Sequence, residues 1–163
     1  MAKYAFIDVQ NTASTTQRML KFVIDWNKLC KYLKESWGCD KIFLYSGIEN
    51  GDENTAKEFS DLATNLGCIV RTKTIIAFKN QDKTISHKCI KCGEESIEVI
   101  DMGYRKKSNC DVELTTDALE YAGPETEFYI FTADGDFVYL IEKLISKGSK
   151  INLVSNANKY VNK

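Results

Sequence analysis

The chain has 163 residues, of which 44% are hydrophobic and 28% are charged, and its formal net charge is −1. This composition is typical of a folded globular protein with a hydrophobic core and excludes a disordered chain. We therefore expect a single domain over residues 1–163, and the overall charge identifies no partner by itself.

Nothing in the sequence predicts export or membrane insertion. The longest apolar runs are shorter than the roughly 18 residues of a membrane-spanning helix. The apolar stretch near the N-terminus is short and contains Asp8, unlike the core of a signal peptide. Six cysteines without an export signal are typical of a reducing compartment, so we expect a cytoplasmic protein without a membrane partner.

The charges are distributed unevenly along the chain. Residues 71–107 contain nine Lys and Arg residues and five acids, whereas the remainder has a net charge of −5. A basic segment on an acidic body suits a protein that brings a polyanion to a site lined by carboxylates. A solvated, lysine-rich hairpin explains the same charges equally well.

Apolar segments that alternate with amphipathic segments predict the fold class. We expect five buried strands, over residues 4–7, 41–45, 68–76, 127–132 and 150–154. Four helices are expected between them, over residues 15–37, 54–66, 110–122 and 137–147, and Asn109 is expected to cap the third. This alternation predicts an α/β fold with a mainly parallel five-stranded sheet, in the order 3-2-1-4-5, covered by helices on both faces. The polar residues 77–104 interrupt the alternation, and we interpret them as an inserted basic hairpin that contains a CxxC motif.

Four aspartates are expected to converge at one edge of this sheet. Asp8 ends the first strand, and Asp134 and Asp136 follow the fourth. The strand order switches between these two strands, where α/β sheets bind ligands beyond the carboxyl ends of their strands. Asp111 lies in the first turn of the preceding helix, on the same face as Leu114, so it points to the same edge.

Carboxylates this close raise one another's pKa unless a cation neutralises them. Hard oxygen ligands suit Mg²⁺ or Mn²⁺, which can activate water and stabilise charge on a phosphodiester. Asn11, three residues after Asp8, is placed to hold a metal-bound water or a substrate phosphate. Each acid alone also has a structural explanation: a turn residue at Asp8, a helix cap at Asp136 and a helix-dipole contact at Asp111. Asp117 is rotated by about 240° from Asp111 around the helix, and we expect it behind the site or at the surface.

Three motifs together resemble the NYN branch of the PIN-like nucleases, of the LabA type. They are FIDVQN (residues 6–11), KSNCDV (107–112) and TADGDF (132–137), and their order and spacing extend the resemblance over nearly the whole chain. The resemblance implies a Rossmann-like three-layer sandwich and a metal-dependent endoribonuclease that acts on single-stranded RNA. It assigns the catalytic role to Asp8, Asp111, Asp134, Asp136 and Asn11, and the binding of Mg²⁺ or Mn²⁺ to the four aspartates.

Two other functions fit parts of this pattern. Val9 and Ala133 stand where the family usually has glycine, and a non-catalytic RNA-binding or adaptor module that keeps the scaffold would tolerate such changes. A strand followed by Asp-x-Asp also occurs in Toprim-like phosphotransferases, but that group has a glutamate near the first strand where this chain has Asp8.

The CxxC motif has the spacing of a zinc knuckle. Cys89 and Cys92 supply two thiolates, whereas a tetrahedral zinc site needs four ligands. His87, Cys68, Cys110 or a second copy of the chain could supply the others. A structural Zn²⁺ ion, reduced cysteines without a ligand and a redox pair all remain open, and so does a homodimer.

The basic run Arg105, Lys106 and Lys107 precedes Asp111 and is expected to border the acidic site. We predict that these three side chains bind the phosphates of RNA, with the bases of the hairpin extending the track. We expect Tyr104 to be a buried aromatic residue, and stacking on an RNA base is the alternative.

Overall fold

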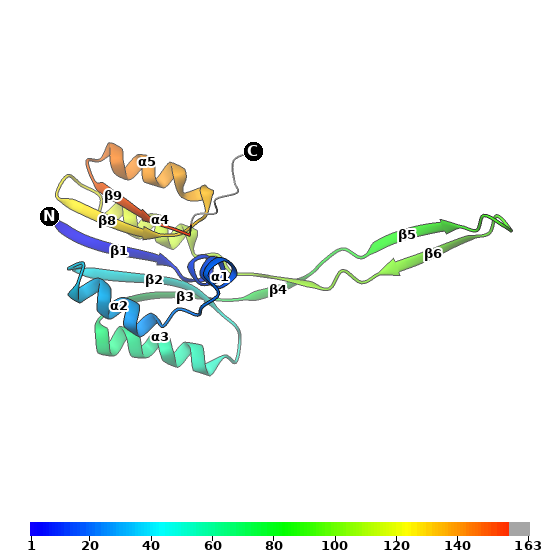
Figure 1. Cartoon of the computed structure of the whole chain (residues 1–163), viewed down its shortest axis with the longest axis horizontal. Helices are drawn as coiled ribbons and strands as arrows, with labels where there is room; N and C mark the ends of the chain where they lie inside the picture. Colours follow the sequence, from blue (N-terminus) through cyan, green and yellow to red (C-terminus); the bar gives the residue numbers. More distant parts are fainter. Residues whose placement is uncertain (157–163) are drawn as a thin grey trace.

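The computed structural model describes residues 1–156, except for the side chain of Lys107. Its centre is a parallel five-stranded sheet in the order β3-β2-β1-β8-β9, which confirms the predicted fold class and strand order (Figure 1). The strands are β1 (Ala2–Asp8), β2 (Lys41–Ile48), β3 (Ile69–Thr74), β8 (Thr126–Phe131) and β9 (Lys150–Val154). Because β1 is the middle strand, a residue at its carboxyl end lies at the centre of one sheet edge.

Helices cover both faces of the sheet (Figure 1). They are α1 (Val9–Leu20), α2 (Trp26–Glu35), α3 (Glu53–Leu66), α4 (Asp111–Glu120) and α5 (Val138–Ser146), with a short 3₁₀ turn, η1 (Gly135–Phe137), before α5. Helices α2 and α3 pack on one face, whereas α4 and α5 pack on the other. None of the helices within residues 1–156 is long and apolar enough to cross a membrane.

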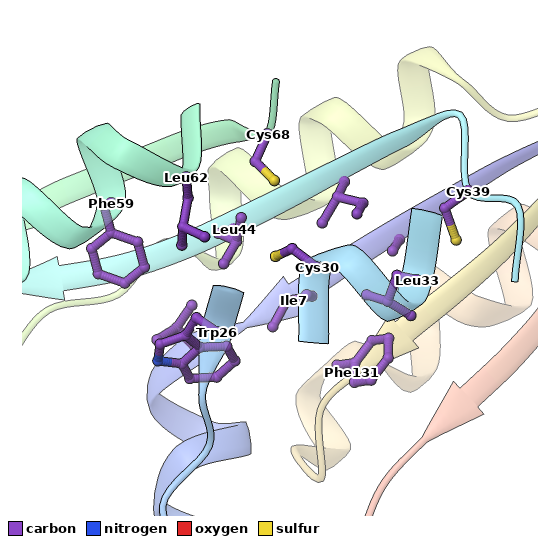
Figure 2. Close-up of a cluster of buried hydrophobic side chains, with 13 residues drawn as sticks. Ile7, Trp26, Cys30, Leu33, Cys39, Leu44, Phe59, Leu62, Cys68 and Phe131 are labelled. Atoms are coloured by element: carbon purple, nitrogen blue, oxygen red, sulfur yellow. The ribbon is translucent and has the colours of Figure 1, made fainter. Parts of the chain in front are cut away.

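Alternate residues of β1 contribute to two separate hydrophobic clusters, because successive side chains of a strand point to opposite faces. Ile7 packs with Leu33 of α2 and Leu62 of α3 (Figure 2). Phe6 points to the other face, where its ring stacks on that of Phe43 with 4.5 Å between the centroids. A strand buried on both faces accounts for the uninterrupted apolar run that predicted it.

The prediction of one helix over residues 15–37 is wrong, because the structure has two helices, α1 and α2, in this part of the chain. Helix α1 begins directly after β1 and ends at Lys21, which adopts a left-handed conformation with φ of 62°. Helix α2 begins after Asp25, whose side chain accepts a hydrogen bond from the N–H of Lys28 at 3.0 Å. An N-cap of this kind starts a new helix even where apolar residues continue at helical spacing.

The strand predicted over residues 68–76 is also divided. Strand β3 ends at Thr74, and the chain continues into an arm, which we define as residues 76–107. In the arm, β4 (Ile76–Lys79) pairs with β7 (Tyr104–Lys107), and β5 (Lys83–Lys88) pairs with β6 (Glu95–Ile100), both antiparallel. The arm extends away from the sheet (Figure 1).

The two ends of the arm meet at Gly47 in β2. A Cβ atom placed on Gly47 would lie 2.5 Å from both Cβ and Oγ of Ser108, and 2.9 Å from Cγ1 of Ile75. The N–H of Ile75 donates to the carbonyl of Ile48 at 2.9 Å. A residue without a side chain is therefore required at position 47 for the chain to enter and leave the arm beside β2.

Candidate functional site

Asp8 is fixed at the end of β1 by contacts to two neighbouring segments. Its Oδ1 accepts a hydrogen bond from the N–H of Asn11 at 3.1 Å, so Asp8 is the N-cap of α1. Its Oδ2 accepts from the hydroxyl of Thr132, just after β8, at 3.4 Å. The carboxylate therefore lies where β1 and β8 end side by side.

Asn11 connects α1 to the loop after β8. Its Oδ1 accepts a hydrogen bond from the N–H of Ala133 at 2.8 Å. Since this donor fixes the orientation of the amide, the NH₂ group of Asn11 must point elsewhere.

The loop after β8 is ordered by its own polar side chains. The hydroxyl of Thr132 accepts from the N–H of Asp134 at 3.1 Å. Asp134 in turn caps η1, because its Oδ1 accepts from the N–H of Asp136 at 3.0 Å. Asp134, rather than Asp136, is therefore the capping residue of this turn.

Asp111 reaches the same edge from the start of α4. Asn109 accepts a hydrogen bond from the N–H of Asp111 through its Oδ1 at 2.8 Å. Asn109 thus contacts the first turn of α4, although the N-cap position is Cys110, one residue later than predicted.

An open cavity of about 430 Å³ lies at this edge of the sheet. Three of the predicted carboxylates and the predicted asparagine line it together: Asp8, Asp111, Asp134 and Asn11. Asp136 is exposed and is not among the residues described as lining this cavity. Sequence positions more than 100 residues apart therefore meet where the strand order predicted a ligand site.

The carboxylates that line the cavity disfavour one another's ionised form. Burial is the main cause that raises the pKa of Asp8 above its ordinary value, and the charges of Asp111 and Asp134 raise it further. The hydrogen bonds from Asn11 and Thr132 act in the opposite direction. A group whose ionised form is disfavoured in this way is stabilised by a bound cation.

The donor set fits a hydrated divalent cation rather than a closed metal cage. Within residues 1–156, no group of three or more His, Cys, Asp or Glu side chains is arranged to hold one metal ion. Mg²⁺ commonly binds proteins through one or two carboxylates and keeps several waters, and an open cavity leaves room for them. A ligand set of all four aspartates stays a prediction.

Asp117 was expected behind the site or at the surface, and the structure buries it behind the cavity. Its Oδ2 accepts from the hydroxyl of Tyr45 at 2.9 Å and from Nε of Arg71 at 3.2 Å. Burial, together with the hydrogen bond and charge of Asp117, raises the pKa of Tyr45. Since Tyr45 lines the cavity, Asp117 holds one of its walls in place. Tyr45 and Arg71 are register partners on β2 and β3, which only the folded sheet reveals.

The basic residues are placed only in part as predicted. Lys106 lines the cavity, and its Nζ lies 2.5 Å from Oε1 of Glu49. Arg105 is exposed on β7, and the side chain of Lys107 is outside the described part of the structure. Tyr104 is exposed to 68%, so the expectation that it is buried is wrong. It lies at the surface because β7 belongs to a two-stranded arm with no layer above it.

The model of one protein family, the NYN domain, matches residues 4–162. The chain belongs to the NYN domain family. The resemblance of the three motifs to this family is thus confirmed. The match includes both the five-stranded sheet and the arm.

This NYN domain is similar to one curated protein and to several solved structures. It is 27% identical over 113 residues to the low amplitude and bright protein LabA of Synechococcus elongatus, which covers 69% of this chain. The aligned part is half the length of LabA. A crystal structure of a protein of unknown function from Vibrio parahaemolyticus has a TM-score of 0.61 at 19% identity, covering 94% of this chain and 80% of that one. This likeness shows a shared fold.

Phosphofructokinase-2 from Escherichia coli is a more distant neighbour. Its tetrameric inhibited form has a TM-score of 0.45 at 11% identity, covering 96% of this chain and 55% of that one. A score this low supports no argument about the NYN domain.

Proposed function

We propose that this NYN domain is a metal-dependent endoribonuclease that hydrolyses phosphodiester bonds of single-stranded RNA. The observation that carries the proposal is the convergence of Asp8, Asp111 and Asp134 on one open cavity at the edge of the sheet. Family membership supports the same reaction, because the resemblance to PIN-like nucleases implies it.

One or two of the carboxylates of Asp8, Asp111 and Asp134 would bind Mg²⁺ or Mn²⁺ directly, and the rest of the set would contact the waters that the ion keeps. The ion would supply a Lewis acid that activates water and neutralises charge on the scissile phosphate. Asp8 is the most constrained of the three, since both of its oxygens accept hydrogen bonds from the protein. The fixed orientation of Asn11 leaves its NH₂ group as a donor for a phosphate oxygen in the cavity. Asp136 lies two residues after Asp134 in η1, and its N–H donates to Oδ1 of Asp134.

The arm extends the proposed RNA site beyond the cavity. Lys106 borders the cavity, and Arg105 is its neighbour on β7, opposite Phe78 of β4. Phe78 and Tyr104 are exposed to 46% and 68%, respectively. Exposed aromatic rings among basic side chains are typical of surfaces that bind single strands, because the rings stack on bases while the cations contact phosphates. We include Lys107, the third basic residue of this run, among the proposed phosphate contacts because of its position in the sequence.

Reversing the charge of Lys106 is expected to weaken RNA binding. The Lys106→Glu variant removes a cation at the cavity and places a second carboxylate beside Glu49. For single-stranded RNA, the slope of log affinity against log salt should fall by about 0.7 for each lost phosphate contact. Fluorescence anisotropy over a salt series measures this slope. Lys31→Glu on the exposed side of α2 makes the same change in net charge and should leave the slope unaltered; equal effects of both variants would contradict a local contact.

Removal of divalent ions is expected to abolish cleavage. A circular single-stranded RNA has no ends, so only an endonuclease can linearise it. We expect linear product with Mn²⁺ or Mg²⁺, none in EDTA, and recovery when excess Mn²⁺ is added back. A circular single-stranded DNA of the same sequence tests the preference for RNA. Cleavage that persists in EDTA would overturn the metal-dependent reaction.

A non-catalytic RNA-binding or adaptor module is the second candidate. The observation that favours it is the lack, within residues 1–156, of three acidic, His or Cys side chains arranged around one ion. RNA binding that depends on Lys106, without product under any divalent ion, would select this candidate. For either function we propose a cytoplasmic location, in keeping with the free thiols of all six cysteines.

A further inference from the structure

The tip of the arm presents two cysteines in a tight turn between β5 and β6. The N–H of Cys89 donates to the carbonyl of Glu94, and the N–H of Gly93 donates to the carbonyl of Cys89, both at 2.8 Å. Gly93 has a φ of 72°, which closes the turn in a conformation that favours glycine. Both cysteines are exposed.

Cys89 and Cys92 are separated by two residues in this turn, and Gly93 follows them directly. This is the spacing of a zinc knuckle, in which both thiolates bind the same ion.

The other cysteines and the histidine considered from the sequence do not complete the site. Cys68 is buried between α3 and the sheet, and Cys110 is buried in the cluster on the opposite face. Nε2 of His87 lies 3.6 Å from Oε2 of Glu98, across the ladder. In the described part of the chain, no third His, Cys, Asp or Glu joins Cys89 and Cys92. A tetrahedral zinc ion bound here thus lacks two ligands.

We propose that Cys89 and Cys92 of two copies of this chain bind one Zn²⁺ ion as a tetrathiolate site that joins the tips of two arms lying side by side. Each copy supplies an identical pair of ligands, as a two-fold symmetric contact requires. Four thiolates and one Zn²⁺ carry a net charge of −2, and Lys91 of each copy, which lies between the two cysteines, provides a compensating cation.

The outer ladder of the arm provides an independent argument for a second copy. Strands β5 and β6 form a separate two-stranded sheet that pairs with no other strand. Ile97 and Val99 lie on one of its faces and are exposed to 71% and 63%, respectively. An isolated two-stranded hairpin is only marginally stable in water, and small units without a core usually depend on a metal or on association. The same face of a second arm would cover these side chains.

Zinc content and molecular mass of the full chain test the proposal without reference to RNA cleavage. Protein purified under reducing conditions and supplied with ZnCl₂ should contain one zinc for every two chains, measured by plasma mass spectrometry after desalting. Light scattering after gel filtration should give the mass of a dimer, which falls by half when the zinc is chelated. Cobalt substituted for zinc should give the absorption spectrum of four thiolates around a tetrahedral ion.

The Cys89→Ser/Cys92→Ser variant should lose both the zinc and the dimer while keeping the thermal unfolding transition of the sheet, because the tip contributes nothing to the two hydrophobic clusters. Ile90→Ser, which changes a fully exposed residue between the cysteines, should retain both. One zinc per chain in a monomer would overturn the proposal, as would a dimer that survives chelation or a chain that binds no zinc and forms a Cys89–Cys92 disulfide in air.

Discussion

Replacing Asp8 by asparagine is expected to lower the rate of RNA cleavage at least about 100-fold, the usual scale for losing one group that acts directly in the reaction. Asparagine keeps an oxygen that can accept the hydrogen bond from the N–H of Asn11, so α1 retains its cap. What is lost is the negative charge that the proposed cation needs. The measurement is the initial rate of linearisation of circular RNA in Mn²⁺.

A matched control separates the charge of Asp8 from its capping role. Asp52 caps α3 with the same geometry, accepting from the N–H of Thr55 at 3.1 Å, and does not line the acidic cavity. Asp52→Asn should therefore cleave at the rate of the unmodified chain. Equal losses in both variants would show that the effect comes from the helix caps and not from the site.

The same Asp8→Asn variant should be more stable than the unmodified chain when metal is absent. The pKa of Asp8 in the folded state is raised above 3.8, so the folded state holds the proton more tightly than the unfolded state. Folding stability then falls as pH rises from about 3.8 through the raised pKa, and it stays lower at neutral pH. Urea unfolding in EDTA at several pH values should show this loss in the unmodified chain, and the difference from the variant should vanish at acidic pH. Parallel curves for the two proteins would contradict the raised pKa.

A methyl group at position 47 is expected to destabilise the fold by about 1–3 kcal/mol, the range observed when atoms are forced into a closely packed region. In Gly47→Ala the added Cβ would meet Ser108 at 2.5 Å, a distance that no packed carbon tolerates. Either β2 or the return of the arm to α4 must move, and both border the cavity. The free energy of unfolding from urea titration measures the cost.

Two further variants show whether the close approach is the cause. Gly123→Ala adds the same methyl group where nothing lies within 4 Å, so it should leave the free energy of unfolding nearly unchanged. Ser108→Gly combined with Gly47→Ala removes the two closest atoms, Cβ and Oγ of Ser108, and leaves Cγ1 of Ile75 at 2.9 Å, so it should recover part of the loss. If the double variant were as unstable as Gly47→Ala alone, the contact with Ser108 would not be the cause of the instability.

The fold could be predicted because its central strands β1, β2 and β8 are apolar and largely buried, and because all five strands are short and separated by helices or by the arm. Prediction from the sequence failed where individual residues decide where a helix ends or where the chain turns. Lys21 and Asp25 end one helix and start another within an apolar pattern that continues across the break. The return of the arm to the body depends on a close approach at Gly47 that no local pattern encodes.

The site was predictable to the extent that the topology determines it. Asp8, Asp111 and Asp134 follow from strand order and helix direction alone, and the structure places them around one cavity. The sequence left two positions open for Asp117, behind the site or at the surface, because helical rotation relative to Asp111 says nothing about Tyr45 and Arg71 on the neighbouring strands. Whether the carboxylates share a single ion depends on side-chain distances, which no sequence pattern specifies.

The contacts that position the acidic residues come almost entirely from backbone amides within a few residues or from the adjoining loop. Asp8 accepts from position 11, Asp134 accepts from position 136, and Asn11 accepts from position 133. Main-chain donors are the same whatever side chain they carry, so the surrounding sequence can drift widely while this geometry persists. The hydrogen bonds that orient these side chains therefore depend little on which residues fill the layers beneath the sheet edge.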